Sequence, residues 1–355
     1  MILRTNCHLN TTHQLNMEAM KLKCPLFHRF FGAFLLIVGM LRILSVEMLR
    51  NDSLLFDVTL LSRKLTATQA AFPRNFTNIS SYEDLVRLVD FNIPVPRDLN
   101  IFFMGDSLTR YQYLDLAFFI SRNGTWFSDS KNDPHFEAKG GLTWNSFYTF
   151  SDEVLRPYEM LCDCTRRGNN PETPRENRYF CDPVYNNRLV FLQKFGHIPF
   201  RTSWDISHIN EHPNTLVNDP QNMSVAQIMN WTEAVENFVC KMTPKPDYFI
   251  FNSGWWDDEE FSQPAVQEAM IRALSNCNII SVYKTTTIAR SKERLDEKRE
   301  RMCQLTDVCF NVSWTDLVPP EHYVDDKHFA PPLYSMINLH LLSMLASGDI
   351  LSVNS

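Results

Sequence analysis

From residue 100 onward, short apolar runs alternate with longer stretches in which apolar side chains recur at helical spacing. The runs have the length of buried strands and cover residues 100–104, 189–195, 248–251 and 278–283. The longer stretches repeat apolar residues every three or four positions and cover 108–121, 264–275 and 332–345. Strands that alternate with helices form parallel sheets with both faces covered. The pattern therefore predicts an α/β fold with a central parallel sheet between two layers of helices.

Polar and charged segments surround these elements. Residues 82–89 have the pattern of a short amphipathic helix, and the prolines at 94 and 96 break the chain after it. Residues 293–302 are highly charged, which is typical of a solvated helix face. The segment 122–187 is polar and rich in Gly, Pro, Asn and Cys, so we predict an irregular structure for it.

The N-terminal part contains a candidate membrane anchor. An uncharged, mostly apolar run covers 30–40, and four further residues follow Arg42. A spanning helix needs about 17–25 mostly apolar residues, so this is a short span in which Arg42 would reach an interface. The basic flank before the run places the N-terminus in the cytosol. A cleaved signal peptide and a buried helix are the alternatives, but no small-residue cleavage site is obvious.

These boundaries give a domain division. It consists of a cytosolic tail at 1–29, a signal anchor at 30–46, a stem at 47–95 and a globular domain at 96–350. Sequons for N-glycosylation suit a lumenal domain and follow the apolar run at Asn51, Asn75, Asn78, Asn123, Asn222, Asn230 and Asn311.

Composition and cysteine content agree with this division. The chain has 355 residues, of which 44% are hydrophobic and 21% charged, and its net charge of -7 excludes a basic nucleic-acid footprint. Of nine cysteines, seven follow the anchor, where an oxidising lumen favours several disulfides. The most local candidate pair is Cys303 with Cys309. For Cys162 and Cys164, a metal site is the alternative to disulfide formation, but their spacing is not the usual one for zinc.

The first candidate for chemistry is Ser107. An apolar strand runs into Gly105, Asp106 and Ser107, and a helix follows. Gly105 allows a sharp turn, Asp106 can cap the helix, and Ser107 lies at the strand edge where open α/β sheets bind ligands. Ser107 could equally be an ordinary capping residue. Arg110 in the first helical turn opposes the helix dipole, so it needs either a carboxylate partner or a role in the site.

The second candidate group follows the strand at 248–251. Asn252 can present its side-chain N–H groups to an oxyanion, although an Asx turn is the structural alternative. Trp255 and Trp256 come shortly after it. A tryptophan pair that follows a polar turn suits a sugar-binding platform, and burial in the core is the alternative.

The third candidate group is Asp325 with His328. A carboxylate and an imidazole three positions apart can point into one cleft, where Asp325 holds the ring and the ring takes a proton from Ser107. Asp326 is too close along the chain to orient His328 as well. A polar surface loop is the structural alternative.

These motifs, in this order, resemble the SGNH/GDSL hydrolase superfamily. The closer similarity is to its PC-esterase branch, which includes the plant trichome-birefringence-like polysaccharide O-acetyltransferases. Gly105–Gln112 resembles the Gly-Asp-Ser-Leu-x-Arg-x-Gln motif of that branch, and Asn252–Trp256 resembles its Asn-Ser/Thr-Gly segment followed by Trp. The resemblance covers roughly residues 98–345. The chain departs from the plant proteins beside the final Asp-x-x-His, where it has Val324, Lys327 and Phe329.

The resemblance implies an SGNH-type three-layer α/β/α domain in a single-pass Golgi membrane protein. It implies acyl transfer, chiefly of acetyl groups, to glycan hydroxyls through Ser107, with a donor such as acetyl-CoA or an acetylated intermediate and no metal. Asp106, Arg110, Asn252, Trp255 and Trp256 would surround the reaction, and Gly141 is a candidate for the oxyanion glycine of the family. An esterase with the same triad and an inactive glycan-binding module are the alternatives.

Overall fold

The computed structural model describes residues 80–128, 154–155, 157–164, 176–196, 200–202, 227–256, 259–290 and 297–347. The predicted tail, the predicted anchor and residues 47–79 of the predicted stem lie outside these ranges, as does Gly141. None of the helices in the described ranges combines the length and the apolar character that crossing a bilayer requires.

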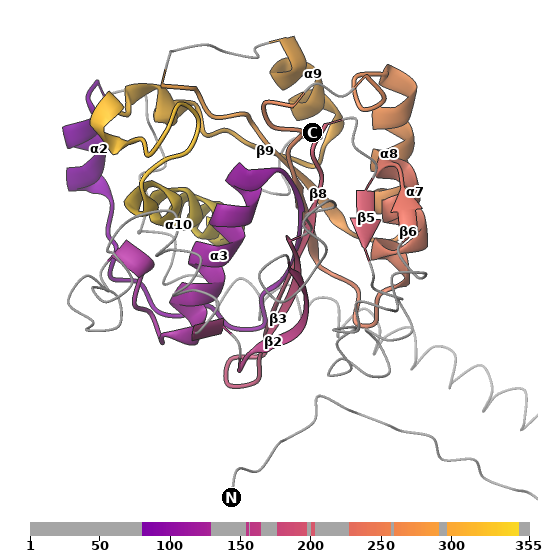
Figure 1. The fold of residues 1–355 in the computed structure, drawn as a ribbon, viewed down its shortest axis with the longest axis horizontal. Coiled ribbons are helices and arrows are strands. Elements are labelled where there is room, and N and C mark those ends of the chain that lie inside the picture. The colour runs from indigo at the N-terminus through magenta and orange to yellow at the C-terminus, as the bar shows by residue number, and fades with distance from the viewer. Residues whose placement is uncertain are drawn as a thin grey trace, which may run out of the picture. The chain divides into compact units, whose positions relative to one another are not determined.

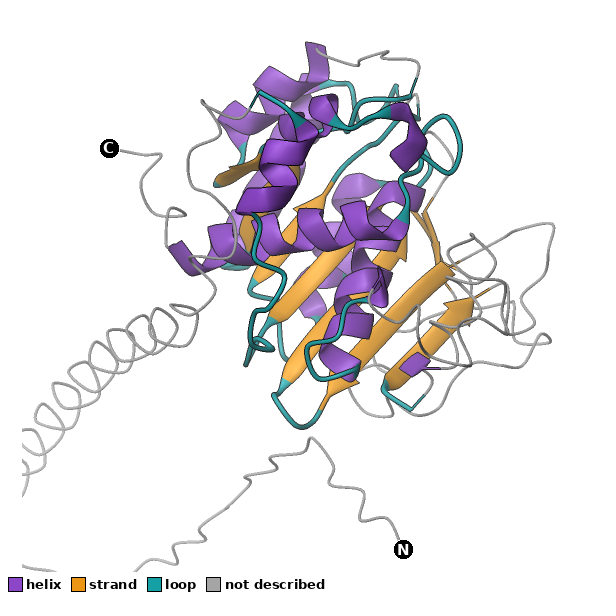
Figure 2. Ribbon diagram, turned by 90° about the vertical axis from the view of Figure 1, so that its left-hand side faces the viewer, coloured by secondary structure: helices purple, strands orange, loops and turns teal. Residues whose placement is uncertain are grey.

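The centre of the structure is a seven-stranded sheet with the order β2-β3-β4-β1-β7-β8-β9, whose strands lie side by side in Figure 2. Its strands are β1 (Asn100–Gly105), β2 (Glu159–Cys164), β3 (Glu176–Asp182), β4 (Asn187–Gln193), β7 (Tyr248–Phe251), β8 (Ile280–Lys284) and β9 (Val308–Phe310). β4, β1, β7, β8 and β9 are parallel, whereas β2 and β3 are antiparallel to their neighbours. A separate ribbon pairs β5 (Phe200–Thr202) with β6 (Gln227–Met229). The α/β class is therefore confirmed, but the sheet is mixed and not purely parallel.

The helices pack on both faces of this sheet. They are α2 (Tyr82–Leu88), α3 (Ser107–Ser121), α7 (Trp231–Asn237), α8 (Pro264–Asn276), α9 (Glu297–Leu305) and α10 (Pro331–Ser347). Short 3-10 helices are η4 (Val239–Lys241), η5 (Ser313–Leu317) and η6 (Pro320–His322). Figure 1 shows α3 and α10 on one side of the sheet and α7 and α8 on the other.

The predicted irregular segment 122–187 is the main error of the sequence analysis. It contains β2 and all of its antiparallel partner β3, which together extend the sheet beyond β4. Asn177 and Arg178 in β3 are fully buried polar residues, and they interrupt the apolar alternation that would mark a strand. The predicted charged helix at 293–302 corresponds to α9, which begins at Glu297, and residues 291–296 lie outside the described ranges.

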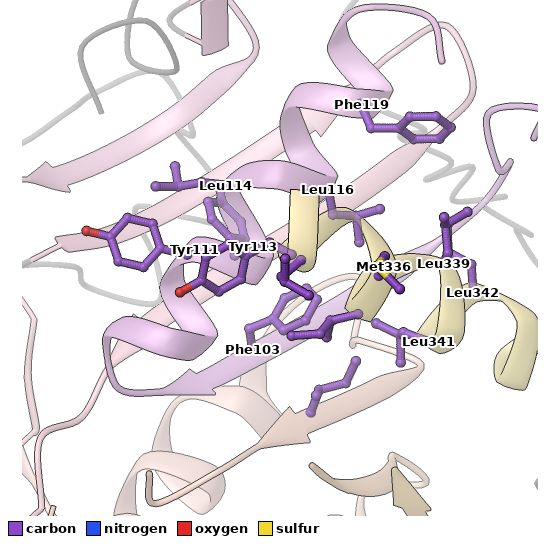
Figure 3. Close-up of a cluster of buried hydrophobic side chains, with 14 of the residues drawn as sticks. Phe103, Tyr111, Tyr113, Leu114, Leu116, Phe119, Met336, Leu339, Leu341 and Leu342 are labelled. Carbon is purple, nitrogen blue, oxygen red and sulfur yellow. The ribbon is translucent and has the colours of Figure 1, made fainter. Parts of the chain in front are cut away.

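Side chains of β1 alternate between two cores. Ile101 and Phe103 join the cluster formed with α3 and α10, whereas Phe102 and Met104 join the cluster formed with α7 and α8. All four are inaccessible to solvent, which explains why the strand reads as one uninterrupted apolar run. Figure 3 shows Phe103 below α3, in the same cluster of buried side chains as the leucines of α10. The central strand is thus held from both faces, and its carboxyl end is fixed in position.

Among the described residues, two disulfides lie at α8 and α9. Cys240 pairs with Cys277 and joins η4 to the end of α8, and Cys303 pairs with Cys309 and joins α9 to β9. The predicted Cys303–Cys309 pair is confirmed. The pairs close loops with sequence separations of 37 and 6 residues, and on the chain-entropy argument the longer loop gives the larger stabilisation.

A partly buried histidine on α10, His340, makes stability depend on pH. Trp314 Nε1 donates to His340 Nδ1 at 3.2 Å, and burial lowers the pKa of His340 to about 3. Between that value and the ordinary value of 6.5, the unfolded chain binds a proton that the folded chain does not, so stability falls as the pH drops. His340→Gln should reduce this acid-side loss, measured as the difference in urea midpoint between about pH 7.5 and about pH 5. An unchanged difference would contradict this role for His340.

Candidate active site

The Ser107 turn joins the carboxyl end of β1 to the start of α3. Asp106 has extended backbone angles and caps the helix, because its Oδ1 accepts the N–H of Leu108 at 3.0 Å. The predicted capping role of Asp106 is therefore confirmed. A Cβ on Gly105 would lie 2.6 Å from Thr109 Oγ1 and 2.8 Å from the Asn252 carbonyl oxygen. Glycine is required here because the turn packs directly against the backbone at the end of β7.

The structure brings Ser107, His328 and Asp325 into one hydrogen-bonded line. Ser107 Oγ lies 2.6 Å from His328 Nε2, and His328 Nδ1 lies 2.7 Å from Asp325 Oδ2. Asp325 Oδ1 also accepts the backbone N–H groups of Lys327 and His328, both at 2.9 Å. Partial burial alone would raise the pKa of Asp325, but the hydrogen bonds from the His328 ring and these amides outweigh it and lower the pKa. Asp325 is therefore ionised at neutral pH and faces the ring as an acceptor.

The backbone and aromatic contacts around His328 fix its ring. Tyr323 and Phe329 form an antiparallel bridge, and Val324 donates its N–H to the His328 carbonyl at 2.8 Å, so the loop closes on itself. The buried Tyr111 ring from α3 meets the His328 ring edge-on at 5.7 Å. Tyr111 in turn packs on Tyr334 of α10 at 5.5 Å. The imidazole of His328 thus packs against α3, the helix that begins with Ser107.

Asn252 lies beside the Ser107 turn, but its side chain faces elsewhere. Its backbone N–H donates to the Met104 carbonyl, which places it next to the end of β1. Its Nδ2 donates to the Lys284 carbonyl at 2.6 Å and to Thr286 Oγ1 at 3.3 Å, and the residue is fully buried. The structure therefore directs both N–H groups of the amide to buried acceptors at the end of β8 and just after it, and not to an oxyanion as expected from sequence.

Arg110 has aromatic and amide contacts near the site. Its Nη1 donates to Gln193 Oε1 at 3.3 Å, and Nη2 lies 3.4 Å from the Tyr111 hydroxyl oxygen. The guanidinium carbon lies 5.1 Å from the centre of the Tyr111 ring. Gln193 ends β4, so Arg110 connects the first turn of α3 to the neighbouring strand end.

The two tryptophans differ in exposure. Trp255 is partly buried, and Lys327 Nζ lies 5.2 Å from the centre of its ring, so the loop after β7 contacts the loop that carries His328. Trp256 is 43% exposed, and its ring lies 4.9 Å from that of Phe195. Trp256 with Phe195 therefore presents an aromatic surface to solvent, whereas Trp255 holds two site loops together.

Two residues that shape this site, Gly254 and Lys284, had no role predicted from sequence, although Gly254 lies within the motif 252–256. Gly254 is buried with a φ of 66°, and a Cβ there would overlap the Asp106 carboxylate. Lys284 ends β8 as a buried cation. The signal for Lys284 was available, since a lysine directly after an apolar strand lies at the edge where the other site residues gather. Nothing in the sequence around Gly254 indicates which side chain it faces.

No family model, curated protein or solved structure matches this chain. In the ranges that the structure describes, no group of three or more His, Cys, Asp or Glu side chains is placed to hold a metal ion.

Proposed function

We propose that this chain is a serine acyltransferase with an SGNH-type three-layer domain, in which Ser107 carries the acyl group and His328 with Asp325 moves the proton. The observation that carries the proposal is the continuous line from Ser107 Oγ through the His328 ring to the Asp325 carboxylate. Nucleophile, base and orienting carboxylate at hydrogen-bonding distance define a triad by geometry and role, independently of fold. Ser107 also lies at the carboxyl edge of the parallel strands, where open α/β sheets bind ligands.

The first half-reaction follows from these contacts. Ser107 Oγ attacks the acyl carbonyl carbon while its proton passes to His328 Nε2. Asp325 accepts the hydrogen bond from His328 Nδ1–H and stabilises the imidazolium that forms. The tetrahedral intermediate collapses, the bond to the leaving group breaks, and His328 returns the proton to that group. Ser107 then carries the acyl group as an ester.

In the second half-reaction, an acceptor hydroxyl gives its proton to His328 and attacks the Ser107 ester. A second tetrahedral intermediate releases Ser107, which recovers its proton from His328. If the acceptor is a sugar, the product is an acylated glycan, and if it is water the result is hydrolysis. The exposed ring of Trp256 beside Phe195 favours a sugar, because flat aromatic faces pack against pyranose rings.

Charge on the intermediate would be stabilised at the start of α3. The first N–H groups of a helix have no partner within the helix, and Asp106 takes that of Leu108. The N–H of Ser107 therefore serves as an oxyanion donor at the positive end of the helix dipole. Arg110, one turn later, adds a positive charge on the same side. The resemblance described above supports acetyl as the acyl group, a glycan as the acceptor and the Golgi lumen as the compartment.

The proposal is tested with the purified full chain and an activated acetyl ester. We expect acid quenching in the steady state to trap a mass increase of one acetyl group on the peptide that contains Ser107. Adding oligosaccharide acceptors should then divert acetyl from water to sugar. Release of acetate with no acetylated sugar would replace the transferase by an esterase. Sugar binding with no acyl group on Ser107 would reduce the domain to a binding module.

A further inference from the structure

Lys284 is a buried cation at the end of β8, two strands from the end of β1 that leads into the Ser107 turn. It ends β8, the neighbour of β7, and is 1% exposed. Its Nζ donates to Gln112 Oε1 of α3 at 3.1 Å, and Gln112 is itself fully buried. In the part of the chain that the structure describes, Lys284 forms no ion pair. A buried ammonium held only by a neutral amide is expensive, so it needs a further reason to be present.

The reason is the charge on Asp106. Burial lowers the pKa of Lys284 to about 8, and Asp106 is the charged group that acts in the opposite direction and favours the ammonium form. Asp106 is also only 1% exposed. Two opposite charges removed from water in this way stabilise each other even without direct contact, because the interior screens them weakly. Either charge without the other would be left uncompensated in the core.

Both groups hold the same part of the site. Asp106 caps α3 through Oδ1, and its Oδ2 packs against Gly254 in the loop after β7. Lys284 reaches α3 through Gln112, and its carbonyl oxygen accepts the amide of Asn252 from the end of β7. The pair therefore joins three segments, the start of α3, the loop after β7 and the end of β8, around Ser107.

We propose that Lys284 is a positioning residue, whose buried charge balances Asp106 and thereby fixes the turn that carries Ser107. The inference rests on the proposed acyl transfer at Ser107. Lys284 touches neither His328 nor Asp325 in the hydrogen-bonded line, so it acts through Asp106 and not on the reacting atoms.

The test is a double-mutant cycle of Lys284→Met and Asp106→Asn in the full chain, with kcat and KM for an activated acetyl ester and the thermal midpoint of each protein. Lys284→Met removes the charge and leaves Asp106 unbalanced, so we expect kcat to fall about 10²-fold with KM almost unchanged, as misplacement of a reacting group does. Asp106→Asn preserves a helix cap but removes the negative charge. Adding it to Lys284→Met should restore kcat at least about tenfold and raise the thermal midpoint above that of Lys284→Met.

Gln112→Leu is the matched control, because it removes the hydrogen bond to Lys284 and leaves the charge. We expect it to cost less than about tenfold. If the two substitutions in the cycle act independently on kcat and on the thermal midpoint, or if Gln112→Leu is as damaging as Lys284→Met, the charge-balancing role is wrong. If Lys284→Met does not fold, the double variant must fold, and failure of both overturns the inference. Absence of an acyl group on wild-type Ser107 would instead refute the proposed function, and the cycle of thermal midpoints would still report the coupling.

Discussion

Ser107→Ala should lower kcat/KM for an activated acetyl ester by about four to six orders of magnitude, because it removes the atom that forms the acyl bond. His328→Ala should lower it by a similar amount, since the serine hydroxyl then has no base at 2.6 Å. The two losses should not add, because the residues act as one unit. Steady-state kinetics of the two single variants and of the double variant measure these effects.

Matched controls come from the same segments. Ser121→Ala changes a serine at the opposite end of α3, where its hydroxyl donates to the Phe118 carbonyl. His322→Gln changes a histidine that packs on Tyr82, before the loop of His328. Both should retain activity within a few-fold of wild type, since neither contacts the triad. If Ser107→Ala retained even one tenth of wild-type activity, the acyl-enzyme mechanism would have to be abandoned.

Gly254→Ala is the second substitution for which we expect a large loss, roughly 10²-fold or more in kcat. The residue has a φ of 66°, which costs an alanine about 1–2 kcal/mol, and its new methyl group would overlap the Asp106 carboxylate. The loop after β7 or the cap of α3 must therefore move, and Ser107 moves with the cap. Kinetics and a thermal melt of the same protein separate lost geometry from lost folding.

Gly124→Ala is the control for the backbone strain that an alanine with positive φ causes. Gly124 has a φ of 93°, but the nearest atom to an added Cβ would be Val95 Cγ2 at 3.6 Å, an ordinary contact. It should lower the thermal midpoint and leave kcat unchanged, because it strains the backbone far from the Ser107 turn. Equal losses of kcat in the two variants would mean that the contact between Gly254 and Asp106 is irrelevant to the site.

Prediction from sequence succeeded where a local pattern alone decides the structure. β7 has the predicted bounds because four buried apolar residues stand between polar ones, and α3, α8 and α10 lie within one or two residues of their predicted ranges. It failed for β3, because Asn177 and Arg178 are buried within the sheet although their polarity predicted an irregular segment. Burial of a polar residue depends on neighbours that are distant in sequence.

The same distinction applies to the site. Ser107, Asp325 and His328 could be selected because each motif indicates its own local geometry, namely a strand-to-helix turn and an i, i+3 pair. The direction of the Asn252 amide could not be predicted, since it is determined by acceptors at Lys284, the last residue of β8, and at Thr286 just after it. Contacts between strand ends arise only after the sheet has formed.

The last helix, α10, is hydrogen-bonded to α3, the helix that begins with Ser107. Ser335 Oγ and Asn338 Nδ2 of α10 donate to the buried Asp115 carboxylate of α3, and Asn338 also reaches the Gln112 carbonyl. Ser107 and His328 are 221 positions apart, so the nucleophile and its base come from opposite ends of the domain. A ribosome must therefore finish nearly the whole domain before the hydroxyl gains its base, and a nascent or truncated polypeptide that ends before Asp325 would carry a serine with no base to take its proton.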